Sequence, residues 1–150
     1  MYFQRMVKMA NTVKLTEKGL IKKAEEALRG CLEQVPFLTI KKKVQREVRS
    51  ESTSLDLVFK VKTPDAEQTV VAEVKNSGQP RVVREAVNQL LRYRSKFPEA
   101  YGVLVAPYVS PQSAAICARE GVGYVDLAGN CRLSFRQVYV EREGKPNPAP

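Results

Sequence analysis

The chain has 150 residues, a length that suits one folded domain, and its 43% hydrophobic and 27% charged residues exclude a disordered or fibrous protein. It carries 25 lysines and arginines against 16 acidic residues, and a net charge of +9 is typical of proteins that bind polyanions. The chain contains no histidine, which excludes serine–histidine–aspartate and cysteine–histidine nucleophiles and HExxH zinc sites. Any catalysis must therefore depend on carboxylates, lysine, tyrosine, cysteine or a metal ion.

The three cysteines, Cys31, Cys117 and Cys131, are odd in number and form no CxxC pair, so neither a zinc cluster nor a disulfide framework is predicted. We expect them to be small core or surface residues, and this cysteine usage favours the reducing cytoplasm. The sequence has no run of 18 apolar residues and no signal-peptide pattern, so no membrane association is expected.

The first half of the chain combines one helical pattern with β-rich runs. A helix and three strands are predicted at residues 16–34, 38–49, 55–62 and 70–75. Thr16 is a good helix cap, and Pro36 ends the helix. Leu55, Leu57 and Phe59 alternate regularly and are expected on one face of their strand. We expect the three strands to pair in sequence as a meander.

The second half of the chain alternates helices with strands. Two helices and three strands are predicted, at residues 81–96, 102–106, 110–121, 122–127 and 131–140. Pro98 stops the first of these helices, and the pair Ser110-Pro111 is a strong start for the second. The predicted fold class is therefore α/β, with a mixed β-sheet flanked by helices.

Two carboxylates and a lysine fall where neighbouring strands are predicted. Glu73 and Lys75 are two residues apart on one strand, so they project from the same face, roughly 6.6 Å apart along it. Asp56 lies on the preceding strand, and the two carboxylates converge at one end of the sheet if these strands are neighbours. With the backbone carbonyl of Val74, they would offer hard oxygen ligands to Mg²⁺, for which Mn²⁺ can substitute. The Lys75 ammonium would position water or stabilise charge on a phosphate.

This layout resembles the PD-(D/E)xK nuclease superfamily. Asp56, the strand-end triplet Glu73-Val74-Lys75 and the helix after it follow the order of that superfamily's restriction-endonuclease-like αβββαβ core, over about residues 16–106. The resemblance implies that Asp56 and Glu73 bind the metal and that Lys75 assists the nucleophile. The sequence departs from the usual pattern in one respect, because Leu55 and not proline precedes Asp56.

The resemblance also implies site residues on the helices. In several branches of the superfamily a glutamine of the following helix lines the site, often with a tyrosine four residues later, and Gln89 and Tyr93 match this pair. Other branches use a glutamate of the first helix, for which Glu25 and Glu26 are candidates. Without the resemblance, all four residues are more typical of exposed or packed helical surface.

A purely structural interpretation of the triplet stays open. A Glu-x-Lys pattern is common by chance, and a second copy, Glu143-Gly144-Lys145, lies near the C-terminus. In this interpretation Glu73 and Lys75 are a solvated pair on an edge strand, and Asp56 is a surface carboxylate.

Basic residues are concentrated in residues 1–62, which carry 14 basic and 7 acidic side chains. Candidate nucleic-acid contacts lie on the predicted strand 38–49 and helix 81–96, and are Lys41, Lys42, Lys43, Arg46, Arg49, Arg81, Arg84, Arg92, Arg94 and Tyr93. A solvated basic surface is the alternative. The favoured partner is DNA, with RNA as an alternative, and a free sheet edge would permit a homodimer.

The segment 121–130, GVGYVDLAGN, resembles one that follows the nuclease-like core in bacterial winged-helix proteins, some of them antitoxin-type regulators. Within it, Asp126 is expected to cap the turn at Gly129-Asn130, or else to contribute late to the site. We expect an N-terminal tail at residues 1–15, the nuclease-like domain at 16–143, and a proline-rich linker, or the point where a longer parent was cut, at 144–150.

The sequence therefore predicts a Mg²⁺-dependent endonuclease that hydrolyses phosphodiester bonds in DNA. The alternative is a catalytically weak or inactive nuclease-fold domain that binds DNA within a transcriptional regulator or antitoxin. A protein-interaction module with an inert nuclease-like fold is a third interpretation.

Overall fold

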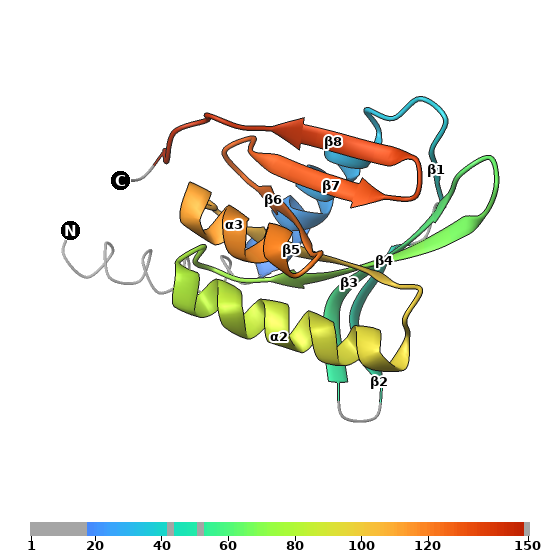
Figure 1. Cartoon of the computed structure of the whole chain (residues 1–150), viewed down its shortest axis with the longest axis horizontal. Helices are drawn as coiled ribbons and strands as arrows, with labels where there is room; N and C mark the ends of the chain where they lie inside the picture. The colour runs from blue at the N-terminus through green and yellow to red at the C-terminus, as the bar shows by residue number, and fades with distance from the viewer. Residues whose placement is uncertain (1–17, 42–43, 51–52, 149–150) are drawn as a thin grey trace, which may run out of the picture.

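The computed structural model of the chain describes residues 18–41, 44–50 and 53–148 (Figure 1). After a first helix (residues 18–32), the elements in chain order are β1 (Thr39–Ile40), β2 (Gln45–Ser50), β3 (Thr53–Lys62), β4 (Glu67–Val74), α2 (Pro80–Lys96), β5 (Tyr101–Ala106), α3 (Pro111–Arg119), β6 (Gly123–Asp126), β7 (Cys131–Phe135) and β8 (Val138–Arg142). The tail predicted at residues 1–15 lies outside the described residues.

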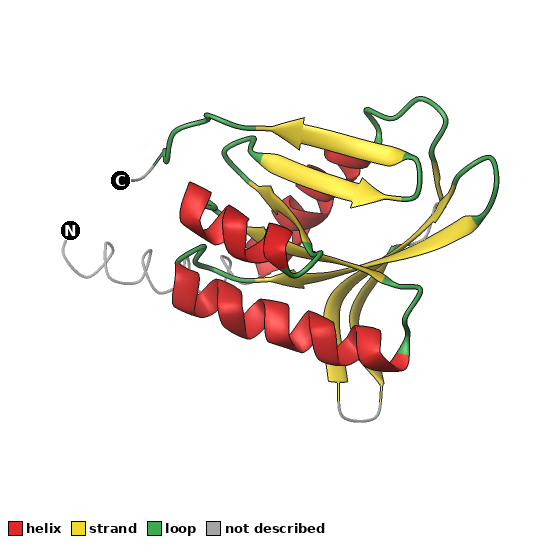
Figure 2. Cartoon of the chain, viewed as in Figure 1, coloured by secondary structure: helices red, strands yellow, loops and turns green. Residues whose placement is uncertain are grey.

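One mixed sheet joins all of these strands, in the order β1-β3-β4-β5-β6-β7-β8, and β2 pairs with β3 beside β1 (Figure 2). The pairs β4–β5 and β5–β6 are parallel because α2 and α3 connect them as crossovers, and the remaining pairs are antiparallel. The αβββαβ order and the mixed sheet flanked by helices confirm the predicted fold class.

Two predicted strands have different boundaries in the structure. The extended segment at residues 38–49 is divided into β1, which pairs with the end of β3, and β2, which pairs with its beginning. The strand predicted at 131–140 is a hairpin, because Arg136 and Gln137 form a two-residue loop between β7 and β8. Arg136 has a φ of +48°, which such hairpin loops require and which arginine seldom adopts, so no glycine or asparagine marks the turn in the sequence.

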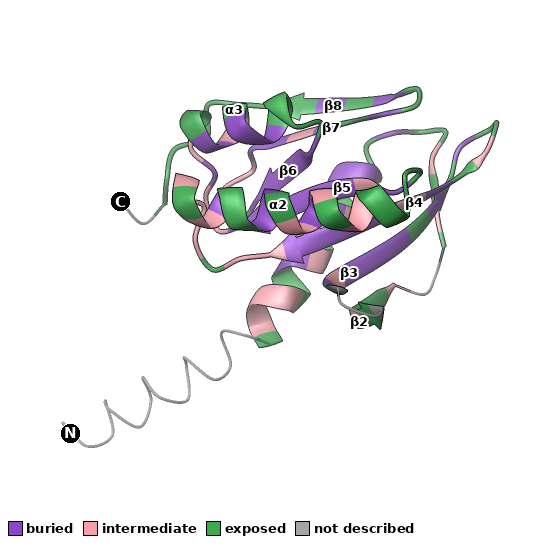
Figure 3. Ribbon diagram, turned by 60° about the horizontal axis from the view of Figure 1, so that its bottom comes forward, coloured by how far each residue is buried: buried purple, intermediate pink, exposed green. Residues whose placement is uncertain are grey.

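The sheet separates two hydrophobic cores (Figure 3). One core contains the first helix and the inner sides of β7 and β8, including Leu28, Phe59 and Leu133. The other contains α2 and α3, including Leu90 and Leu104. β5 is apolar and buried from Gly102 to Ala106, and the neighbouring β4 is buried from Val70 to Glu73, which holds the end of β4 in a fixed position.

Candidate active site

Asp56 and Glu73 lie on neighbouring antiparallel strands. The β3–β4 pairing includes Leu57 opposite Ala72, and the same register carried one residue further sets Asp56 opposite Glu73. Beyond this pair the Asp56 side chain bonds to the backbone of β4. The Asp56 Oδ2 accepts a hydrogen bond of 2.7 Å from the backbone N–H of Val74. A bond this short to an ionised acceptor is strong, so it fixes the Asp56 carboxylate against the end of β4.

The strand β3 changes face at Asp56. Leu57 and Phe59 pack into the core of the first helix, whereas Leu55 packs into the core of α2, so the prediction that all three share one face is wrong. On the neighbouring strand β2, Glu47, opposite Asp56 in the register, has a φ of +51°. A residue with a side chain rarely adopts this conformation within a strand, and such strain often accompanies a functional site.

Glu73 is buried, with only 3% of its surface exposed, on a central strand of the sheet. This contradicts the interpretation of Glu73 as a solvated residue on an edge strand. Its Oε1 has no hydrogen-bond partner. Burial, and then the neighbouring Asp56 carboxylate, raise the pKa of Glu73 to about 8, against smaller lowering effects of Lys75 and the Asp56 backbone N–H. Glu73 is therefore mostly protonated at neutral pH unless a cation replaces the proton.

Lys75 follows β4 directly and is half-buried beside Glu73. Its backbone N–H donates to the carbonyl of Val105, at 2.9 Å, which continues the parallel pairing beyond the strand. The loop after it is held against the start of α3: the buried hydroxyl of Ser113 donates to the carbonyl of Gly78 at 2.6 Å. A Cβ at Gly78 would overlap the carbonyl oxygen of Tyr108, so only glycine fits this contact.

The two α2 residues implied by the resemblance have partners of their own. Gln89 donates a hydrogen bond of 2.9 Å to the backbone carbonyl of Ser54, two residues before Asp56. Gln89 thus fixes the beginning of β3 beside the carboxylate pair. Tyr93 stacks on Phe97 with ring centroids 4.7 Å apart and packs against the core of α2. Its ring serves packing, and burial raises its pKa.

The glutamates of the first helix do not join Asp56 and Glu73. Glu25 accepts from the guanidinium of Arg46 on β2 at 2.8 Å, and Glu26 lines a cavity together with residues of β6 and β7. No group of three acidic, cysteine or histidine ligands assembles anywhere in the described part of the chain. The pair still fits a hard divalent cation, because Glu73 has an unsatisfied buried oxygen, and Mg²⁺ often binds through one or two carboxylates while keeping water and substrate phosphate as further ligands.

The basic candidates divide into paired and exposed residues. Lys41 forms an ion pair with Glu67, and Arg46 forms one with Glu25, while Lys42 and Lys43 lie outside the described residues. Arg49 is exposed on β2.

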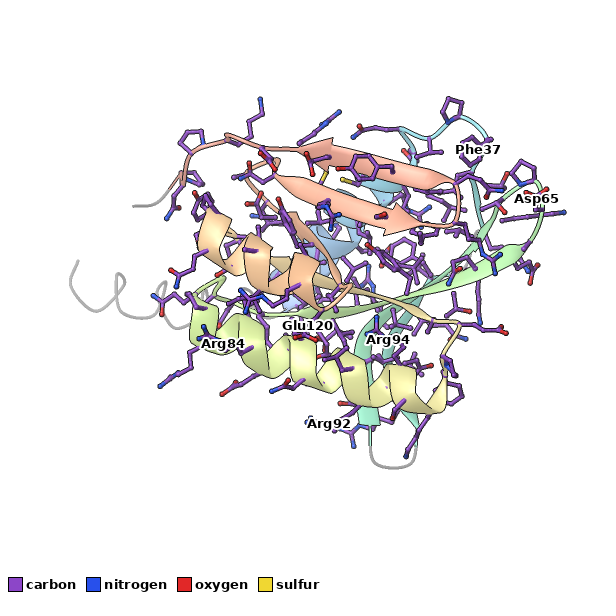
Figure 4. The ribbon with its side chains drawn as sticks, viewed as in Figure 1. Phe37, Asp65, Arg84, Arg92, Arg94 and Glu120 are labelled. Carbon is purple, nitrogen blue, oxygen red and sulfur yellow. The ribbon has the colours of Figure 1, made fainter. Side chains whose placement is uncertain are left out.

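Among the arginines of α2, Arg94 donates to the backbone carbonyls of Glu120 and Gly121 and so caps the end of α3 (Figure 4). Its role is structural. Arg81, Arg84 and Arg92 are exposed on α2 and remain candidate phosphate contacts.

Asp126 organises the loops at the carboxyl ends of the parallel strands, as the turn-capping interpretation predicted. Its buried carboxylate accepts four hydrogen bonds of 2.8–3.0 Å from Val109, Ala128 and Asn130. Asn130 in turn exchanges two hydrogen bonds with the backbone of Lys145, so the segment predicted to be a linker is attached to the domain at this residue. The sequence contained no spacing pattern that indicated these long-range contacts.

No family model and no curated protein matches the chain. Among solved structures it is similar to a repair endonuclease from Pyrococcus abyssi, at 16% identity and a TM-score of 0.46, over 68% of this chain and 46% of the other. It is also similar to EndoMS in a complex with double-stranded DNA, at 20% identity and a TM-score of 0.45, over 69% and 44% of the chains. SfsA of Pyrococcus furiosus in complex with Ca²⁺ follows, at 18% identity and a TM-score of 0.33, over 86% and 63%.

The chain thus spans less than half the length of the two endonucleases. These similarities are weak, and the function below is derived from the residues of this chain. No helix in the described part of the chain is long and apolar enough to cross a membrane.

Proposed function

We propose that the chain is a metal-dependent nuclease that hydrolyses phosphodiester bonds in DNA. The observation that carries the proposal is the unsatisfied, buried Oε1 of Glu73 next to the Asp56 carboxylate. A buried acceptor without a partner costs folding free energy, and its retention is explained if a cation completes the site.

Asp56 and Glu73 would hold the cation, together with the backbone carbonyl of Val74, which follows Glu73 and whose amide donates a hydrogen bond to Asp56. A divalent cation at this position supplies polarisation of the phosphodiester and a more acidic water. Glu73 must release its proton when it binds the cation, because its pKa is raised to about 8. The Lys75 ammonium would orient the attacking water and offset negative charge on the phosphate oxygens. The exposed arginines of α2 would contact the phosphates that flank the cleaved bond.

Nicking of a supercoiled plasmid in Mg²⁺ or Mn²⁺, with EDTA as the metal-free condition, tests this proposal. We expect Asp56→Asn, Glu73→Gln and Lys75→Met each to lower the nicking rate by about 100-fold or more. The matched controls are Glu143→Gln and Lys145→Met, which alter the second Glu-x-Lys triplet and should nick like the wild type. Equal rates in all proteins would identify a contaminating nuclease and contradict the proposal.

Calorimetric titration with Mg²⁺ separates this function from DNA binding without cleavage. A nuclease should bind Mg²⁺, and Asp56→Asn should lose most of that affinity. A DNA-binding domain of a regulator should instead bind duplex DNA in a salt-dependent manner without any divalent cation, and Asp56→Asn should leave that binding unchanged. No binding of either ligand would favour the protein-interaction module.

A further inference from the structure

Two of the three cysteines meet in the core although they are 100 residues apart. Cys31 lies in the last turn of the first helix, and Cys131 is the first residue of β7. Both are buried in the same core, and their thiols form a hydrogen bond with each other. Cys117 lies on α3 in the other core, so it is separated from this pair.

The pair also borders a cavity of about 560 Å³. Both cysteines line this cavity, together with the exposed side chains of Lys23, Gln34 and Arg142, so it is open to solvent. Both cysteines therefore border a solvent-open cavity, although each is itself buried, with 7% of Cys31 and 1% of Cys131 exposed.

The two thiols differ in acidity. The hydrogen bond from Cys31 is the main cause that lowers the pKa of Cys131, and Arg142 adds to it, whereas burial and, less strongly, the Asp126 carboxylate raise it. The same hydrogen bond, together with burial, raises the pKa of Cys31. Cys131 is thus the better nucleophile, and Cys31 is placed to react with its oxidised product.

We propose that Cys31 and Cys131 form a reversible oxidation site. Hydrogen peroxide oxidises the two thiols, which join in a disulfide. The Cys131 thiolate attacks one peroxide oxygen, the O–O bond breaks, and the departing hydroxide takes a proton to become water. The Cys31 sulfur then displaces the hydroxyl of the resulting sulfenic acid as a second water. Two thiols and one peroxide thus give one disulfide and two waters, and a thiol reductant such as glutathione reverses the reaction. The bond, about 2.05 Å long, would link the first helix covalently to β7.

Mass spectrometry of the folded protein after brief treatment with hydrogen peroxide tests this site. Because trypsin separates the three cysteines into peptides 30–41, 97–119 and 120–132, a non-reducing digest should contain 30–41 joined to 120–132, with a loss of two hydrogens. The Cys117 peptide should stay reduced, and Cys117→Ala should form the same link. The oxidised protein should unfold at a temperature about 5 °C or more above that of the reduced protein, since the disulfide closes a long loop. Reduction should reverse this increase.

A link that involves Cys117, a disulfide between two copies of the chain, or oxidation of Cys131 to sulfinic acid without any link would overturn the proposal. Cys31→Ala adds a second readout, because Cys131 should then stop at a sulfenic acid that dimedone traps. If this variant does not fold, the peptide map of the wild type decides alone. The test requires no DNA or divalent metal, so its result is independent of the nuclease proposal.

Discussion

Asp126 and Glu73 are both buried carboxylates near the carboxyl ends of parallel strands, yet they differ in the hydrogen bonds that they accept. Asp126 accepts four hydrogen bonds from the loops around it, whereas Glu73 keeps an oxygen without a partner beside the Asp56 carboxylate. The fold can evidently supply donors to a buried carboxylate at this edge. The deficit at Glu73 is therefore a property of that position, and under the proposed function a bound cation would fill it.

The largest effect is expected from Asp126→Ala. The substitution leaves four donors of two loops without an acceptor, so we expect it to lower the free energy of unfolding by about 3–5 kcal/mol. Urea denaturation measures this change. The control is Asp65→Ala, since Asp65 is exposed and accepts one bond from Gln137, and it should change the stability by less than about 0.5 kcal/mol. Similar losses in both variants would refute a structural role specific to Asp126.

Gly78→Ala should produce the next largest effect. The new methyl group overlaps the carbonyl of Tyr108, and we expect a loss of about 1–3 kcal/mol together with displacement of the loop after Lys75. Gly30→Ala is a matched control, because nothing lies within 4 Å of a Cβ there and the position is helical, so it should gain about 0.5–1 kcal/mol. Thermal unfolding compares the two, and a neutral Gly78→Ala would show that the loop adapts.

Glu73→Gln should have a smaller effect on stability, and of the opposite sign. Because the pKa of Glu73 is raised to about 8, the unfolded chain loses this proton at lower pH than the folded protein does. In EDTA the stability of the wild type should consequently fall as the pH rises from about 4.5 to 8. Glutamine removes this dependence and should stabilise the protein at pH 8. Parallel pH profiles for the two proteins in denaturant titrations would disprove the shifted pKa.

The smallest effect is expected from Arg46→Ala, which removes the ion pair with Glu25. The Arg46 side chain is 49% exposed, so the loss should be at most about 1 kcal/mol and should shrink at high salt. Unfolding at low and at high ionic strength checks this. If Mg²⁺ affinity also changed, Glu25 would be closer to the cation site than its pairing indicates.

The central part of the site could be predicted from sequence because it depends on local rules. The alternation of Leu57, Phe59 and Val61 and the short run that ends in Glu73 and Lys75 are enough to predict two neighbouring antiparallel strands. Whether the three residues act in catalysis stays a prediction, which the nicking assay above addresses.

Other features depend on contacts that no sequence pattern encodes. The face change at Asp56 lies opposite the positive φ of Glu47, and neither glycine nor asparagine marks that position. The pairing of Glu25 with Arg46 joins residues 21 apart on different elements, so helical spacing could not reveal that this glutamate is occupied. Likewise, the hydrogen bond between Cys31 and Cys131 arises only when the C-terminal hairpin folds over the first helix.

The contact between Gly78 and Tyr108 bears on how a substrate would be received. Since the backbone after Lys75 is wedged between β4 and the beginning of α3, this segment has no room to swing as a lid. The segment after Lys75 is already ordered in the absence of a ligand, so ligand binding costs little conformational entropy in this segment. Under the proposed function, the adjustment in shape that docking of a stiff duplex demands would consequently come from the nucleic acid.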